Sequence, residues 1–269
     1  MNQMNKTKIP SYLTIKQKSK TSTPELFIDG EIVSDEYEDS DTSAAGFRDA
    51  LKSLGDAKVI NLHINSPGGS VFEGIAIYNM LKQNSAHINV YVDGLAASIA
   101  SVIAMSGDAI FMPSNSMMMI HNPWTMAVGN ANELRKQADD LDQITKSSVQ
   151  TYLAKAGDKL DEGTLKQLMD DETWLTAQEA VDYGLADEVM EPNKAAASIN
   201  KNFAERYKHV PKQLIKNEVT NNKKPTLTKE KLAQIRENAE AQISVLSSSL
   251  KEQKEELKHG FVRNEDKQA

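Results

Sequence analysis

The chain has 269 residues and a net charge of −7, a length that suits one large domain or one domain with an appendage. It has no cysteine, which excludes disulfide bonds, thiolate metal sites and a cysteine nucleophile. We find no run of about 18 apolar residues and no basic stripe across the body. We therefore expect a cytoplasmic protein that binds neither membranes nor nucleic acid.

The N-terminal part begins with a polar segment and continues into a regular pattern. Residues 1–23 are rich in Lys, Thr and Ser and lack hydrophobic periodicity, so we expect a flexible arm. A strand is predicted over residues 25–32. A helix capped by Thr42 or Ser43 follows, and residues 59–64 alternate as a strand.

A glycine-rich turn follows this second strand directly. Residues 65–70 read NSPGGS, in which Pro67 fixes one backbone angle and the two glycines permit conformations that are closed to other residues. We expect Ser70 to cap the helix that starts at Val71. The next strand, residues 88–92, completes a ββα-type repeat, which is typical of a buried parallel sheet.

The same pattern recurs around a serine. Residues 93–101 read DGLAASIAS and connect a strand to a segment with helix-forming character, so Ser98 lies at a strand-to-helix turn. A hydroxyl there can project into a cleft beside the first N–H groups of the helix. The alternative is a turn of small residues that only packs against its neighbour.

The remaining body alternates strands and helices, which predicts an α/β fold. Further strands are predicted over residues 109–112 and 117–120, and further helices over 130–156, 161–169 and 176–183, the last with a capping box of Thr176 and Glu179. Residues 185–189 close the globular body.

The charge pattern divides the chain after the acidic body. Between residues 192 and 231 there are ten Lys/Arg against three Glu, a local balance of +7. We therefore predict a globular domain over residues 24–191 and a basic linker over 192–227, followed by a helical, coiled-coil-like tail over 228–269. A solvated single helix is the alternative for the tail, and we expect the region after Pro192 to be open to proteolysis.

A hydrolytic triad needs a serine, an imidazole that takes its proton and a carboxylate that orients the imidazole. Ser98 lies at its turn, and His121 lies at the end of the strand 117–120, where α/β sheets place catalytic groups. A structural role for this histidine is the alternative. Gly69 and Ile99, one from each turn, are the natural backbone N–H donors for an oxyanion.

Four ordered motifs carry a resemblance to a known family. They are INSPGG at residues 64–69, GLAAS ending in Ser98, MIHNPW at 119–124 and ETWLTAQEAVDYGLAD at 172–187. Together they resemble the Clp-type serine peptidases (family S14), and most closely the Clp-related head maturation (prohead) proteases of tailed bacteriophages. The resemblance spans residues 25–191.

This resemblance implies a Clp/crotonase-like fold of repeated ββα units and roles for single residues. Ser98 would be the nucleophile, His121 the general base, and Gly69 with Ile99 the oxyanion donors. Gly68, Gly69 and Pro123 would bind the substrate strand. No metal or cofactor is implied.

The carboxylate of the triad is open among three neighbours, Asp170, Asp171 and Glu172. We prefer Asp170 to Asp171, because it follows His121 by 49 residues, a spacing that suits the family. All three acids could instead simply begin the turn after a helix.

The resulting prediction is a serine endopeptidase that cleaves capsid or scaffold proteins during phage head maturation, in the host cytoplasm or inside proheads. It would form a homo-oligomeric ring, and the lysine-rich arm argues against an AAA+ unfoldase partner, because it does not resemble the apolar axial loops of housekeeping Clp peptidases. The alternatives are a general ATP-dependent Clp proteolytic subunit that degrades unfolded proteins, and a scaffold module with little peptidase activity. A crotonase-like acyl-CoA enzyme would share the fold but leaves Ser98 and His121 unexplained.

Overall fold

The computed structural model describes residues 23–36, 40–192 and 206–211. Almost all of the predicted arm, the predicted tail and most of the predicted linker lie outside the described residues. The short stretch 206–211 belongs to the predicted linker, and it contacts the α/β body.

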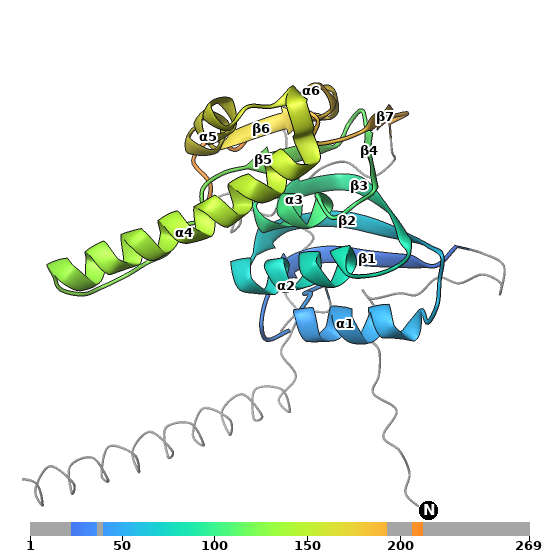
Figure 1. The fold of residues 1–269 in the computed structure, drawn as a ribbon, viewed down its shortest axis with the longest axis horizontal. Coiled ribbons are helices and arrows are strands. Elements are labelled where there is room, and N and C mark those ends of the chain that lie inside the picture. Colours follow the sequence, from blue (N-terminus) through green and yellow to red (C-terminus); the bar gives the residue numbers. More distant parts are fainter. Residues whose placement is uncertain (1–22, 37–39, 193–205, 212–269) are drawn as a thin grey trace, which may run out of the picture. The chain divides into compact units, whose positions relative to one another are not determined.

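A parallel sheet forms the centre of the described body (Figure 1). Its strands run in the order β1 (Glu25–Ile32), β2 (Val59–Gly69), β3 (His87–Ala97), β4 (Ala109–Pro113) and β7 (Glu188–Met190). The strand β5 (Met117–Ile120) pairs in parallel with β3, and β6 (Thr173–Thr176) pairs antiparallel with β5. Leu62, Val90 and Ile110 are fully buried, as expected for strands covered on both faces.

Six α-helices accompany the sheet in the described residues. They are α1 (Ala44–Ser53), α2 (Val71–Lys82), α3 (Ile99–Ala104), α4 (Ala131–Ala156), α5 (Glu162–Asp170) and α6 (Ala177–Asp182). Figure 1 shows α2 and α3 in front of the central strands, and α2 contacts both α1 and α3. No helix in this described part of the chain is long and apolar enough to span a membrane.

The long helix α4 joins the core only through its second half. Its buried residues lie at Ser148, Val149, Tyr152 and Ala156, whereas Leu134 in the first half is 43% exposed. Figure 1 shows the first half extending away from the sheet. The apolar stripe predicted along the whole helix therefore packs against the core over only part of its length.

The structure confirms most predicted elements and corrects two details. Ser43 caps α1 with its side chain, and Thr176 with Glu179 forms the predicted capping box. The side chain of Ser70 makes no capping hydrogen bond; instead its backbone N–H donates to the carbonyl oxygen of Ile32 at 2.7 Å. The strand β6 was not predicted, because four residues between two helices carry too short a pattern.

Candidate active site

Ser98 lies between the end of β3 and the start of α3, as the sequence predicts. Its backbone angles, φ 55° and ψ −128°, lie outside the regions that non-glycine residues usually adopt, at a cost of order 1–3 kcal/mol. The turn is held by two contacts: Ser98 N–H donates to Met119 O at 2.9 Å, and the Ser101 hydroxyl donates to Ser98 O at 2.6 Å. The strained residue is therefore fixed by its surroundings, as in a nucleophile elbow.

His121 follows β5, and strand pairing brings it to the serine. The register of β3 and β5 sets Ala97 opposite Met119, so the residues that follow them are neighbours. His121 Nε2 lies 2.7 Å from Ser98 Oγ, a hydrogen-bond distance. Burial lowers the pKa of His121, and the charge of Glu172 partly offsets this. The imidazole is thus neutral at pH 7 and can accept the proton of the hydroxyl.

The glycine turn at the end of β2 lies against the nucleophile. Gly68 has φ +96°, and a Cβ added there would lie 2.7 Å from Ala97 O and 2.8 Å from Ser98 Cβ. Gly69 has φ +147° and ends β2, and Ile99 is the first residue of α3, whose first N–H groups have no partner within the helix. The two predicted oxyanion donors thus come from adjoining turns, and their role stays a prediction.

In the structure, the predicted third member of the triad, Asp170, and its alternative Asp171 each bind another side chain. The carboxylate of Asp170 accepts a hydrogen bond from the Asn122 amide at 2.6 Å, and that of Asp171 accepts one from Gln167 at 2.9 Å. In the described part of the chain, the His121 ring forms a hydrogen bond with Ser98, and the carboxylate whose charge acts on the imidazole is Glu172.

The physical reason lies in the end of α5. Asp170 is its last residue and Asp171 its C-cap, so both acids still follow the helix. Glu172 then adopts φ 51°, is only 8% exposed and leads into β6, which pairs with the strand that carries His121. Spacing along the sequence could not separate these three acids, because the left-handed residue that redirects the chain is not a glycine.

Sequence reasoning missed an aromatic neighbour of the imidazole. The Tyr207 ring meets His121 edge-on, with centroids 5.5 Å apart, and Trp174 edge-on at 5.9 Å. The Tyr207 hydroxyl donates to the carbonyl oxygen of Pro67 in the glycine turn. Tyr207 and Val210 are the signal that could have revealed this contact, because they are apolar residues within a charged stretch.

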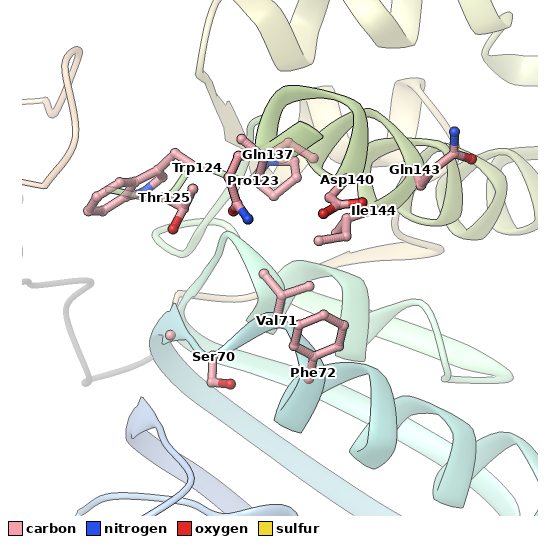
Figure 2. Close-up of a pocket in the computed structure, with 12 residues that line it drawn as sticks. Ser70, Val71, Phe72, Pro123, Trp124, Thr125, Gln137, Asp140, Gln143 and Ile144 are labelled. Carbon is pink, nitrogen blue, oxygen red and sulfur yellow. The ribbon is translucent and has the colours of Figure 1, made fainter. Parts of the chain in front are cut away.

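A cavity of about 590 Å³ adjoins the glycine turn (Figure 2). It lies between the start of α2 and the first half of α4, and Gly69 and Pro123, two predicted substrate-strand residues, line it. Figure 2 shows Val71 and Phe72 on one side facing Ile144 on the other. Its largely apolar lining beside the glycine turn suits the side chain of an extended peptide.

Comparisons with known proteins agree with this geometry. The family model described as Clp protease matches residues 22–193. An ATP-dependent Clp protease proteolytic subunit of Ligilactobacillus salivarius is 36% identical over 171 residues, which cover 63% of this chain and 84% of that protein. A proteolytic subunit of the same name from Pleurastrum terricola is 35% identical over 140 residues, which cover 51% of this chain and 70% of that protein.

A third relative, ATP-dependent Clp protease proteolytic subunit 1 of Salinibacter ruber, is 34% identical over 143 residues, and this match spans only 60% of that protein. The matches confirm the predicted Clp-type fold and the serine-type peptidase class. The names of these relatives favour the general Clp proteolytic subunit over head maturation, which they do not support.

Proposed function

We propose that this chain, which belongs to the Clp protease family, is the proteolytic subunit of a Clp-type protease and cleaves protein chains by acyl transfer at Ser98. The observation that carries the proposal is the 2.7 Å contact of His121 Nε2 with Ser98 Oγ at a strained strand-to-helix turn. A hydroxyl in this position has a base within reach and a backbone that presents it.

The proposed reaction runs in two halves. Ser98 Oγ forms a bond to the peptide carbonyl carbon while His121 Nε2 takes its proton. The carbon–nitrogen bond then breaks as His121 returns that proton to the leaving amine. Water then attacks the acyl-enzyme and gives its proton to His121. His121 returns this proton to Ser98 Oγ as the bond between Oγ and the carbonyl carbon breaks. The backbone N–H groups of Gly69 and Ile99 would hold the oxyanion, and one such donor lowers the barrier by about 3–4 kcal/mol.

We assign the orienting carboxylate to Glu172 rather than to Asp170. Its charge raises the pKa of His121 against the effect of burial, so it stabilises the imidazolium that forms during each half of the reaction. It is also buried, which strengthens this electrostatic effect relative to the exposed acids nearby.

The substrate would bind as an extended strand beside the glycine turn. Gly68 and Gly69 lie at the end of β2, and Pro123 follows the base by two residues. Main-chain hydrogen bonds to such a turn do not depend on sequence, so they suit a protease that accepts many protein chains. The cavity between α2 and α4 would take one apolar side chain of the substrate.

We further propose that the protein works as a homo-oligomeric ring with a separate ATP-driven partner. The relatives are named proteolytic subunits of ATP-dependent proteases, which supports a partner that supplies the unfolded chain. Leu134 in the first half of α4 is exposed, and so are Phe72 and Trp124, which line the cavity. These side chains offer apolar surface for contacts between subunits.

A fluorophosphonate probe tests the peptidase assignment. We expect the full-length protein to be labelled at Ser98, as located by peptide mass spectrometry, and to cleave an unfolded protein. Ser98→Ala should lose both, whereas Ser114→Ala, an exposed serine at the end of β4, should keep both. Labelling and cleavage that persist in Ser98→Ala would disprove the assignment, and an unreactive Ser98 would favour the scaffold alternative.

The lengths of the products separate the proposal from head maturation. A general proteolytic subunit should reduce an unfolded protein to short peptides. A maturation protease should instead cut capsid or scaffold proteins at a few fixed positions. Mass spectrometry of the products after limited and after complete digestion distinguishes the two patterns.

A further inference from the structure

A short piece of the predicted linker lies across the catalytic residues. Residues 206–211 contact the glycine turn, the base, the carboxylate of Glu172 and an apolar cluster at the ends of β3 and β5. The stretch thus contacts four separate parts of the site. Such a set is unexpected for a linker that the charge pattern predicts to be solvated.

The first half of this stretch binds at the nucleophile. Arg206 forms an ion pair with Glu31 of β1, which is the strand next to the glycine turn. The Tyr207 hydroxyl donates to Pro67 O, and the ring of Tyr207 contacts His121 edge-on. Burial raises the pKa of Tyr207 to about 12, although a side-chain hydrogen bond with Ser98 opposes the rise. The hydroxyl therefore stays protonated beside the nucleophile.

The second half binds at the carboxylate. The backbone N–H of His209 donates to Glu172 Oε1 at 2.8 Å, and His209 Nδ1 lies 3.0 Å from Asp171 O. Val210, together with Tyr207, packs against the buried cluster of Leu95, Ala97 and Met119. The stretch thus binds by main-chain, aromatic and apolar contacts at once.

We propose that residues 206–211 form an intramolecular cover that slows the peptidase until the cover is displaced or cut. This regulation rests on the proposed function, because it acts on the same Ser98 and His121. We refer to these six residues as the cover. Its displacement frees the space beside Pro67 O, where a substrate strand pairing with the glycine turn must pass.

The contacts fit an inhibitory role better than a positioning role. The Tyr207 ring packs against the edge of the His121 imidazole, and its hydroxyl lies beside Ser98. A peptide carbonyl must therefore displace Tyr207 to reach the Ser98 hydroxyl. The cover also takes one oxygen of Glu172, the carboxylate that stabilises the imidazolium. A residue that assisted the reaction would leave both groups accessible to the substrate.

The test measures the rate of fluorophosphonate labelling and the cleavage of a short fluorogenic peptide by the full-length protein. We expect Tyr207→Ala to raise both by roughly tenfold or more, because the apparent reactivity scales with the fraction of molecules whose site is open. Lys208→Ala, an exposed neighbour in the same stretch, should leave both rates unchanged. Unchanged or lower rates in Tyr207→Ala would overturn the cover, the lower rate indicating a positioning residue.

A charge exchange tests the same proposal through a different contact. Arg206→Glu and Glu31→Arg should each raise the labelling rate, and the double exchange should bring it back toward that of the wild type. Failure of the double variant to restore the slow rate would show that this ion pair does not hold the cover. Ser98→Ala in the Tyr207→Ala background must abolish labelling. If neither the wild type nor Tyr207→Ala is labelled or active, the peptidase assignment fails, and the cover fails with it.

Discussion

Replacement of Gly68 by alanine tests whether the glycine turn sets the position of the nucleophile. An added Cβ would lie 2.8 Å from Ser98 Cβ and 2.7 Å from Ala97 O, inside the range of ordinary contact, which begins near 3.4 Å. Neither neighbour can rotate away, because one is a backbone oxygen and the other is the first atom of the serine side chain. The turn and the serine must therefore move apart.

The size of the effect follows from these distances. The added Cβ and Ser98 Cβ must move about 0.6 Å apart to reach an ordinary contact distance. A misplacement of about 1 Å costs roughly 100-fold in rate. We therefore expect the rates of labelling and turnover to fall by about 10- to 100-fold. The positive φ of Gly68 adds strain of about 1–2 kcal/mol for any L-residue, and overpacking adds about 1–3 kcal/mol. The free energy of unfolding should thus fall by about 2–5 kcal/mol.

Gly157→Ala supplies the matched control. Gly157 also has a positive φ, +59°, but nothing lies within 4 Å of an added Cβ. Gly157→Ala should therefore lose only the stability that the backbone strain costs, about 1–3 kcal/mol, and keep full activity. Urea unfolding and fluorophosphonate labelling measure both quantities, also in the Tyr207→Ala background. A Gly68→Ala variant that labels at the wild-type rate and is no less stable than Gly157→Ala would refute the reasoning.

Three further predictions address the carboxylate, the core and the pH profile. Glu172→Gln should lower kcat by roughly 10- to 100-fold, a smaller loss than removal of the base His121 would cause. The kcat of Asp170→Asn should stay near that of the wild type. Equal losses of kcat in the two variants would restore Asp170 as a candidate. Tyr152→Phe removes a buried 2.7 Å hydrogen bond with Ser101 and should cost about 1 kcal/mol and lower Tm by about 2–4 °C, seen by thermal unfolding. In Tyr207→Ala, reduced burial should raise the pKa of the catalytic imidazole, so the acidic limb of kcat/KM should move to higher pH; an unmoved limb would contradict this.

The framework of the site could be predicted because it follows from local chemistry. Glycines in NSPGG and small residues around Ser98 mark turns at the ends of strands, and parallel strands bring their carboxyl ends to one edge of the sheet. The bounds of β1 and β5 match the predicted strands, and Ser98 and His121 meet at that edge. The order of the motifs was enough to predict that Ser98 and His121 lie together, because the strand register fixes which residues become neighbours.

Our proposed assignment of the carboxylate to Glu172 could not be made from the sequence, because it depends on how a helix ends. Three acids in succession are equivalent in composition and spacing, and the structure separates them only through the left-handed conformation of Glu172 after the C-cap of α5. The contacts of residues 206–211 were missed for a different reason. A charge count averages over Tyr207 and Val210, two apolar residues that bind the body within a basic stretch.

The carboxylate of Glu172 couples the cover to the chemistry. One of its oxygens accepts the N–H of His209, while its charge raises the pKa of His121. A carboxylate that already accepts a hydrogen bond stabilises a neighbouring positive charge less than a free one, since part of its charge is compensated. Displacement of the cover therefore has two effects at once: it exposes Ser98 to the substrate, and it releases Glu172 to stabilise the imidazolium. An increase in kcat in Tyr207→Ala, beyond a decrease in KM, is the kinetic sign of the second effect, because a purely steric cover would leave the barrier of the open enzyme unchanged.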